Sequence, residues 1–502
     1  MSLSRRDFLK LGGLTAVAAG TAGCSAAGRK LAQDKLPENL PLPAADTAVS
    51  TPDPVLRLLN RAGYGPRPGD LEQARQTGLA AWLEEQLNPN EIEDTAADLL
   101  LRSLTLYQMD VTQLIEQDRK DAAKELIGST ILRALYSRRQ LYEVMVEFWS
   151  DHFNIYLRKN QLIPLAKIID DRDVIRPRAL GKFRDLLRAS AKSQAMLLYL
   201  DNARNTREQP NENYARELLE LHTLGVNAGY TQTDVQETAR ILTGWTIRRR
   251  GRQAGQTIFQ KDAHDFGQKT VLGQTFAGQG EAELDELLEM LATHPATAQR
   301  IAFKLARRFV ADEPPEGLVQ RVAQTFTETD GEIKAMLRVI FLSDEFAAAP
   351  PKLKRPYTYM ISALRALNTD LSLSRNRGIG RWLERLGQLP FHWPPPDGYP
   401  DVAPAWATNL LPRWNFALAL LHNELPGATP PLEKIVAAGK AETTSNVLQL
   451  FAGLVYGRAL TPDEQTLFTT YTGSGPLDDP KTRLRLKDGV ALMLASPAFQ
   501  WT

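Results

Sequence analysis

Apolar residues recur every three or four positions along most of the chain beyond residue 53. This spacing matches the 3.6-residue period of a helix that buries one face. It predicts helices over residues 55–62, 68–76, 79–87, 94–117, 119–135, 139–153, 179–191, 211–226, 231–242, 282–292 and 295–310, with further helices toward the C-terminus. The pattern therefore predicts a predominantly α-helical, multi-helix globular fold.

Residues 245–276 interrupt the helical pattern. Three β-prone pieces, at 246–247, 257–259 and 270–272, are separated by glycine and basic residues. Short runs of β-branched and aromatic residues between such breaks are typical of strands joined by turns. We therefore expect a small β-hairpin region inserted between helices.

Proline content helps to divide the rest of the chain. Residues 24–53 carry several prolines and no sustained period, which predicts a flexible tether. We expect a main helical domain over residues 54–350 and a C-terminal helical domain over residues 351–502. In the second domain, the loop 390–404 contains the proline-rich run 392–400, which cannot be helical and is predicted to be an ordered coil or a lid.

The first 23 residues have the layout of an export signal. The pair Arg5-Arg6 precedes a weakly apolar run, residues 11–23, that is too short to span a bilayer. This layout predicts a twin-arginine signal and export of the folded protein. Cys24 follows Thr21-Ala22-Gly23, which resembles a lipoprotein processing box, so we expect a lipid anchor and a periplasmic or membrane-anchored protein. The alternative is cleavage by ordinary signal peptidase, which would release a soluble protein.

Composition narrows the classes of function. Hydrophobic residues make up 43% of the chain and charged residues 24%, as in ordinary soluble globular proteins. Removal of residues 1–23 takes the net charge from +1 to −1, a balance that does not favour nucleic acid. Contact with a membrane is expected only through Cys24. Because Cys24 is the only cysteine, disulfides, thiolate metal sites and cysteine nucleophiles are excluded.

Two of the six histidines fall on predicted apolar faces. Helical projection places His152 among the apolar residues of helix 139–153, and His222 among those of helix 211–226, with Glu217 at the edge of that stripe. Two buried imidazoles and a carboxylate could together bind a transition metal such as zinc, iron or copper. The alternative is that each imidazole bonds a backbone carbonyl or a core carboxylate. No compact signature such as His-Glu-x-x-His decides between them.

The pair His264-Asp265, in the predicted inserted loop, is a second candidate site. An adjacent carboxylate can orient and charge an imidazole for acid–base catalysis. The alternative is a turn in which Asp265 bonds the backbone before Gly267. The catalytic candidates are thus His264, Asp265 and Glu217, and the metal-ligand candidates are His152, His222 and Glu217.

Several motifs of the chain are landmarks of a known family. They are residues 60–65, 148–153, 210–225, 229–232, 242–245, 264–265, 269, 304–309, 396–400 and 413–415. On these motifs the chain resembles, from Leu56 to Phe499, the large bacterial exported family catalogued as domain of unknown function 1800. Members often carry His-Asn-His-Phe where this chain has Ser150-Asp151-His152-Phe153, so a site that needs the first histidine is altered here.

The resemblance implies export but no established activity. Members are often encoded beside a second exported family that resembles sulfatases, so an exported sulfatase-like protein is the expected partner. We expect a cell-envelope enzyme, either a metal-assisted hydrolase or an oxidoreductase, with a His/carboxylate site. The alternative is a non-catalytic helical scaffold or binding lipoprotein. The enzyme hypothesis needs His152, His222 and His264 to converge near one pocket, whereas the scaffold hypothesis leaves them scattered.

Overall fold

Helices make up most of the described chain, and its strands pair only in two-stranded antiparallel sheets. This confirms the predicted predominantly α-helical fold. The computed structural model describes residues 24–33, 36–44, 53–248, 250–251, 253–372 and 377–502. The predicted export signal, residues 1–23, lies outside the described residues.

The helices before the inserted strands are α2 (Pro54–Arg61), α3 (Asp70–Thr77), α4 (Leu79–Leu87), α5 (Thr95–Leu101), α6 (Thr105–Gln108), α7 (Val111–Leu114), α8 (Arg119–Tyr136), α9 (Gln140–His152), α10 (Ile163–Ile169), α11 (Phe183–Ala191), α12 (Gln194–Tyr199), α13 (Glu212–Glu217) and α14 (Gln232–Ile241). Two π-helices, η3 (Asp170–Ile175) and η6 (Leu218–Thr223), continue α10 and α13.

The later helices are α15 (Glu281–Thr293), α16 (Pro295–Phe309), α17 (Glu316–Glu328), α18 (Ile333–Phe341), α19 (Asp344–Ala347), α20 (Pro356–Ala366), α21 (Arg377–Arg385), α22 (Leu410–Leu421), α23 (Leu432–Ala438), α24 (Thr444–Tyr456), α25 (Pro462–Thr472), α26 (Pro480–Ala495) and α27 (Pro497–Gln500). The strands are β1 (Trp245–Ile247), β2 (Thr257–Phe259), β3 (Lys269–Val271), β4 (Gln274–Phe276), β5 (Asp370–Leu371) and β6 (Ala428–Thr429).

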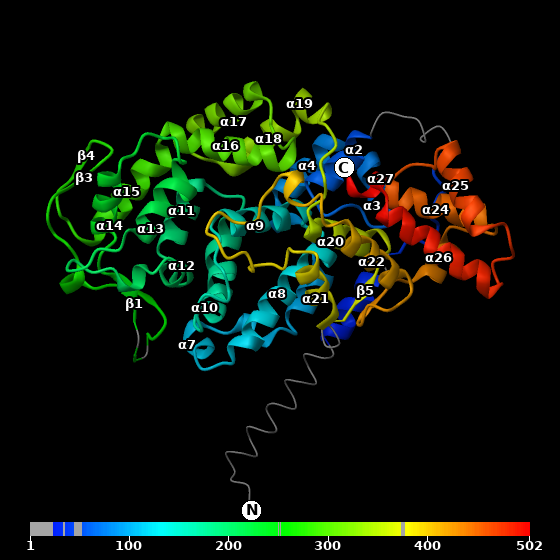
Figure 1. Cartoon of the computed structure of the whole chain (residues 1–502), viewed down its shortest axis with the longest axis horizontal. Coiled ribbons are helices and arrows are strands. Elements are labelled where there is room, and N and C mark those ends of the chain that lie inside the picture. Colours follow the sequence, from blue (N-terminus) through cyan, green and yellow to red (C-terminus); the bar gives the residue numbers. More distant parts are fainter. Residues whose placement is uncertain (1–23, 34–35, 45–52, 249, 252, 373–376) are drawn as a thin grey trace, which may run out of the picture.

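The helices are arranged along an elongated body (Figure 1). Helices α11 to α15 and strands β1 to β4 occupy one end, α24 to α26 occupy the other, and α8, α9 and α10 lie between them. The strands β1 and β2 pair with each other, as do β3 and β4. The predicted β region at 245–276 is therefore confirmed, and it lies at the first of these ends.

Local signals explain where some predicted helices end or break. The expected single helix over 94–117 is divided into α5, α6 and α7, because a capping box at Asp110 starts a new helix at Val111. The expected helix over 211–226 changes from α to π geometry after Glu217. In both places the apolar residues keep their helical spacing across the break, so the spacing gives no sign of it.

The predicted tether is packed against the body in its described parts. Residues 24–33 form a helix, and Ala32 and Leu40 are buried. The side-chain amide of Gln33 donates to the carbonyl of Asn368 at 3.0 Å, and the Leu40 amide donates to the carbonyl of Ala438 at 3.0 Å. The described pieces of the predicted tether therefore contact the helical body.

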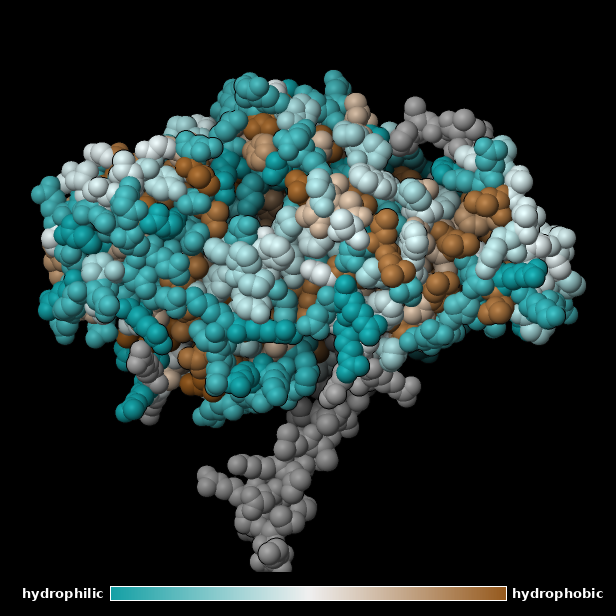
Figure 2. All heavy atoms as spheres, viewed as in Figure 1, coloured by the Kyte–Doolittle hydropathy of each residue, from teal (hydrophilic) through white to brown (hydrophobic). Residues whose placement is uncertain are grey.

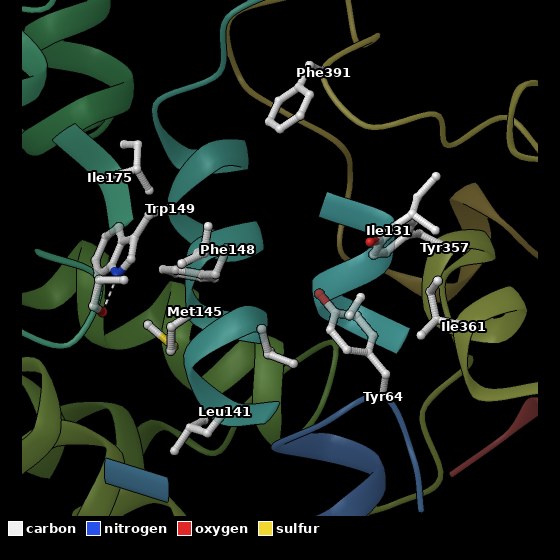
Figure 3. Packing of buried hydrophobic residues seen from close by; sticks show 14 of the residues in the cluster. Tyr64, Ile131, Leu141, Met145, Phe148, Trp149, Ile175, Tyr357, Ile361 and Phe391 are labelled. Atoms are coloured by element: carbon white, nitrogen blue, oxygen red, sulfur yellow. Dashed lines mark hydrogen bonds between the residues drawn. The ribbon is translucent and has the colours of Figure 1, made fainter. Parts of the chain in front are cut away.

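One continuous hydrophobic core crosses the predicted domain boundary at residue 350. Figure 3 shows Tyr64, just after α2, facing Tyr357 at the start of α20, and their rings meet edge to face at 5.6 Å. On α9, the indole of Trp149 donates to the carbonyl of Ala179 at 3.0 Å. The helix α9 is thus fixed inside the core along its length, and its last residue is His152.

Hydrophobic side chains also gather at the surface over α22 and α26 (Figure 2). On α22, Leu411, Trp414 and Leu418 are exposed by 63%, 46% and 40%, and their spacing places them on one face. The exposed Leu492 of α26 belongs to the helix that packs against α22. In the described part of the chain, no helix has the length and apolar character needed to cross a bilayer.

Candidate functional site around Lys304

His152 and His222 lie together in the core, as the helical projections predicted for each of them. Both are 1% exposed, and the centres of their rings are 6.2 Å apart. The Nε2 atom of His152 donates to the backbone carbonyl of His222 at 3.1 Å. This hydrogen bond joins the end of α9 to the π-helix η6.

The π geometry of η6 places His222 in this position. The His222 carbonyl lies in the last turn of the segment, where carbonyls have no partner within the helix, and it accepts from His152. The Thr223 hydroxyl donates to the carbonyl of Leu218 at 2.6 Å. Single π turns are rare and occur frequently at functional sites. The sequence carries no signal for this change of geometry, because it depends on partners that are distant along the chain.

Lys304, on α16, bonds the first of these histidines and is a residue that the sequence did not assign to a site. Its Nζ atom donates to Nδ1 of His152 at 2.9 Å. The hydrogen-bond network therefore assigns the proton of the neutral imidazole to Nε2. Among the described residues, no carboxylate lies within 4.0 Å of this amine.

Two fully buried lysines of the described chain have carboxylate partners. Lys167 pairs with Asp170 at 2.5 Å and Lys269 with Glu283 at 2.7 Å, and all four side chains are excluded from solvent. A buried charge is expensive unless it is paired. Lys304 thus differs from these lysines, because its one side-chain partner is an imidazole.

Desolvation is the main influence on whether Lys304, His152 and His222 carry a charge. Burial, and then the positive charge of Arg300, lowers the pKa of Lys304 to about 7. Burial, and then the charge of Lys304, lowers the pKa of His222 to about 3 and that of His152 well below its ordinary range. At neutral pH the imidazoles are uncharged, and a large fraction of Lys304 is the free amine, which carries a lone pair.

His222 has an unusual environment for a buried histidine. Within the described chain neither of its ring nitrogens has a hydrogen-bond partner. Its ring contacts Phe153 at 5.1 Å and Tyr214 at 6.2 Å between centres. An unsatisfied buried polar group destabilises a fold by about 1–3 kcal/mol, so His222 destabilises this core.

The predicted metal ligands are only partly brought together. Both nitrogens of His152 are already in hydrogen bonds, one of them with the Lys304 amine. Glu217 is partly buried at the end of α13. Over the ranges that the structure describes, no group of three or more His, Cys, Asp or Glu residues is placed to hold a metal ion. The set of His152, His222 and Glu217 is therefore not assembled as a metal centre.

The proline-rich loop covers this end of α9. The Asn154 amide donates to the carbonyls of Trp393 and Pro395 at 2.9 and 2.6 Å. Gly398 has a φ of +77°, and a Cβ atom there would lie 2.0 Å from the carbonyl oxygen of Asp151. The loop is therefore an ordered coil that needs glycine at its point of closest approach.

Asp397 of this loop connects Glu217 with Lys304 electrostatically. Its charge acts to raise the pKa of both groups. The pKa of Glu217 is raised mainly by burial and then by the charge of Glu220. A lysine with a lowered pKa and a carboxyl with a raised pKa are thus both within electrostatic reach of one loop residue.

His264 and Asp265 form a separate cluster. His264 is fully buried, with Nδ1 2.8 Å from the carbonyl of Thr243 and Nε2 3.2 Å from a carboxylate oxygen of Glu283. Asp265 pairs with Arg240 at 2.7 Å and accepts from the amide of Gly267 at 2.8 Å. The turn considered as the alternative is therefore present. In the described chain neither residue forms a hydrogen bond or ring contact with His152 or His222, so two of the three histidines converge and the third does not.

Comparison with known proteins gives one match. The family described as protein of unknown function (DUF1800) matches residues 57–501. No curated protein and no solved structure matches the chain.

Proposed function

The chain belongs to the DUF1800 family, and from that premise we propose that it is an exported cell-envelope enzyme in which the amine of Lys304 is the catalytic base. The observation that carries this proposal is a partly buried amine with no carboxylate partner in the described chain, held 2.9 Å from His152. Lysines are recruited as bases where burial lowers their pKa toward neutrality. The pKa of Lys304, about 7, meets that condition.

Each residue of the proposed site has a definite part in proton transfer. His152 accepts a hydrogen bond from Lys304 and so fixes the direction of the amine. The lone pair of the neutral amine takes a proton from an acidic C–H or O–H bond of the substrate. The charges of Asp151, Asp401 and Asp397 favour the resulting ammonium. Glu217, whose pKa is raised, returns a proton to the product.

This proposal replaces metal assistance with acid–base chemistry, because the described residues supply an amine and no set of three metal ligands. It also drops the required convergence of three histidines, because His264 bonds Thr243 and Glu283 instead. Two features of the earlier hypothesis remain part of it. The pair Arg5-Arg6 and the single Cys24 support export and lipid anchoring. An exported sulfatase-like protein remains the proposed partner, on the ground of the family's usual gene neighbourhood.

A proton-exchange assay tests the proposed base. The purified protein is incubated in D₂O with a panel of small carbonyl compounds, and exchange of their α-protons is followed by proton NMR. We expect at least one compound to exchange, with a rate that rises with pH through about 7 as Lys304 loses its proton. Lys304→Gln should lower that rate by about 100-fold or more, the smaller end of the contribution of a positioned base.

Matched carboxamide variants test the proposed acid and the specificity of the effect. Glu217→Gln should also slow the reaction, whereas Glu208→Gln, at an exposed position before α13, should leave it nearly unchanged. Lys120→Gln, at an exposed position of α8, is the control for loss of a lysine. Equal rates in Lys304→Gln and Lys120→Gln would contradict the assignment.

Export and anchoring are tested in cells. Replacing Arg5 and Arg6 by lysine should leave the precursor in the cytoplasm, because twin-arginine signals require the arginine pair. Cys24→Ala should abolish labelling with a radioactive fatty acid while export continues. Undiminished labelling of Cys24→Ala would contradict the anchor.

The exposed apolar face of α22 favours the second candidate, a non-catalytic binding lipoprotein. Leu411, Trp414 and Leu418 form a stripe of the kind that marks protein interaction sites. Under this alternative, Trp414→Ser would abolish the biological role and Lys304→Gln would not. The enzyme hypothesis expects the opposite pattern.

A further inference from the structure

Lys354 is a second buried lysine without a carboxylate partner. It is 5% exposed, and its Nζ atom lies 3.6 Å from the centre of the Phe499 ring. In the part of the chain that the structure describes, this amine has neither a hydrogen bond nor an ion pair. Lys352, two residues earlier, pairs with Asp312. The lack of a carboxylate partner is therefore particular to Lys354 and is not shared by the nearby Lys352.

The main chain holds Lys354 in place from two sides. Its amide donates to the carbonyl of Gln500 at 2.8 Å, and its carbonyl accepts from Nη2 of Arg413 at 2.8 Å. An antiparallel bridge between Leu353 and Trp501 fixes the neighbouring residue. The amine is therefore presented by a rigid backbone, as a reactive group should be.

Lys354 lines an open cleft of about 780 Å³. The walls come from α2, the end of α24 and residues 498–502, and Tyr456, Phe499 and Trp501 supply aromatic surface. The basic residues Arg57, Arg75 and Arg458 also line the cleft, against one acidic residue, Asp53. A mainly apolar cleft with a few converging polar groups is the usual form of a small-molecule site. Arg75 pairs with Asp53 and Arg458 with Glu464, whereas Arg57 has no carboxylate partner in the described chain and favours an anionic ligand.

The protonation state of Lys354 suits covalent chemistry. Burial, and then the positive charge of Arg413, lowers the pKa of Lys354 to about 7. An ordinary lysine has a pKa of about 10.4 and is almost entirely charged at pH 7, so it is a poor nucleophile. A large fraction of Lys354 is instead the neutral amine.

We propose that Lys354 is a reactive amine that forms an imine with an anionic carbonyl compound bound in this cleft. The amine nitrogen adds to the carbonyl carbon, and the electron pair of the C=O bond moves to oxygen, which takes a proton. Loss of water from this carbinolamine leaves the C=N bond. The water carries away the carbonyl oxygen and both protons of the amine, so no oxidant or reductant is required. The proposal does not depend on the role of Lys304.

Reductive trapping with glyoxylate, an aldehyde that carries a carboxylate, tests this proposal. The full-length protein is incubated with a small excess of glyoxylate, reduced with borohydride, digested and analysed by peptide mass spectrometry. We expect Lys354 to be labelled at pH 7 at least about tenfold faster than the exposed Lys120, because far more of its amine is neutral. Its labelling rate should rise with pH around 7 and then level off.

Acetaldehyde, an uncharged aldehyde, tests the requirement for an anion. The ratio of labelling at Lys354 to labelling at Lys120 should be larger with glyoxylate than with acetaldehyde. An equal ratio would overturn the anionic class of ligand, and a Lys354 rate no higher than that of Lys120 would overturn the reactive amine. Both measurements use the unaltered protein, so they do not depend on the folding of a variant.

The same experiment distinguishes the roles of Lys304 and Lys354, the two lysines whose pKa is about 7. Label at Lys304 without label at Lys354 would overturn the proposal for this cleft and leave the proposed function in place. Label at Lys354 that persists in Lys304→Gln would support the proposal for the cleft, because the label then does not depend on Lys304. Lys354→Arg, which keeps a positive charge but cannot form an imine, should remove the reactive fraction and leave labelling of Lys120 unchanged.

Discussion

Glu147→Ala should lower the free energy of unfolding by about 3–5 kcal/mol, the usual loss when one member of a buried ionic network is removed. Glu147 pairs with Arg355 and, at 3.1 Å, with Arg308, and it accepts from the Tyr64 hydroxyl at 2.8 Å. The two arginines are 4% and 9% exposed. Removal of the carboxylate leaves the guanidinium charges of Arg355 and Arg308 without their full countercharge, at positions that water hardly reaches.

An exposed ion pair provides the matched control for this prediction. Glu84 binds Arg338 through two contacts of 2.7 and 2.9 Å, but the two side chains are 47% and 38% exposed. Solvent screening limits such pairs to about 1 kcal/mol or less, so Glu84→Ala should have a small effect. Denaturant unfolding of both variants measures the difference. Similar losses would show that the network around Glu147 is not stabilised by its burial.

This network also bears on the proposed site, since Arg355 holds Asp151 at 2.8 Å immediately before His152. Burial raises the pKa of Asp151 to about 6, while the charge of Arg355 acts in the opposite direction. Asp151 is therefore committed to a structural ion pair with Arg355. It is not free to stand in for the histidine that the resemblance implies one position earlier, where this chain has Ser150.

The pattern of apolar positions was sufficient to predict the helical fold and the inward direction of His152 and His222. A helix with one apolar face has a single way to be buried, so projection alone determines which side chains point into the core. The same reasoning could not predict the π turn at η6 or the breaks within residues 94–117. Those features depend on individual hydrogen bonds that leave the apolar period intact.

The role of Lys304 required the structure. A weak signal was present, because Lys304 falls beside Ile301 and Leu305 on the apolar stripe of α16. A basic residue in that position is ordinarily neutralised by a carboxylate, and the sequence cannot show that the nearest partner is instead an imidazole from a helix 152 residues earlier. For His264 and Asp265, adjacency in sequence was misleading, because their side chains bond different partners.

His222→Phe should make the protein less sensitive to acid. The folded-state pKa of His222, about 3, lies below the value near 6.5 of an exposed histidine, because of burial first and then the charge of Lys304. Below pH 6.5 the unfolded chain therefore binds a proton that the folded protein does not. Stability is fully present above pH 6.5 and is lost as the pH falls toward 3, by about 4 kcal/mol from this residue.

Phenylalanine removes that proton without removing a hydrogen bond, since neither nitrogen of His222 has a partner in the described chain. Its ring also suits the contacts with Phe153 and Tyr214. Denaturant unfolding between pH 7 and pH 4 should show a shallower decline of stability for His222→Phe, with a slope that corresponds to about one proton fewer. Stability at pH 7 should be equal or higher.

His294→Ser, at the start of α16, is the control for loss of a histidine. If His222→Phe unfolds with the same pH dependence as the unaltered protein, the lowered pKa of His222 is contradicted. If it is strongly destabilised at pH 7, the imidazole nitrogens have a partner, such as a bound ligand, that stabilises the fold.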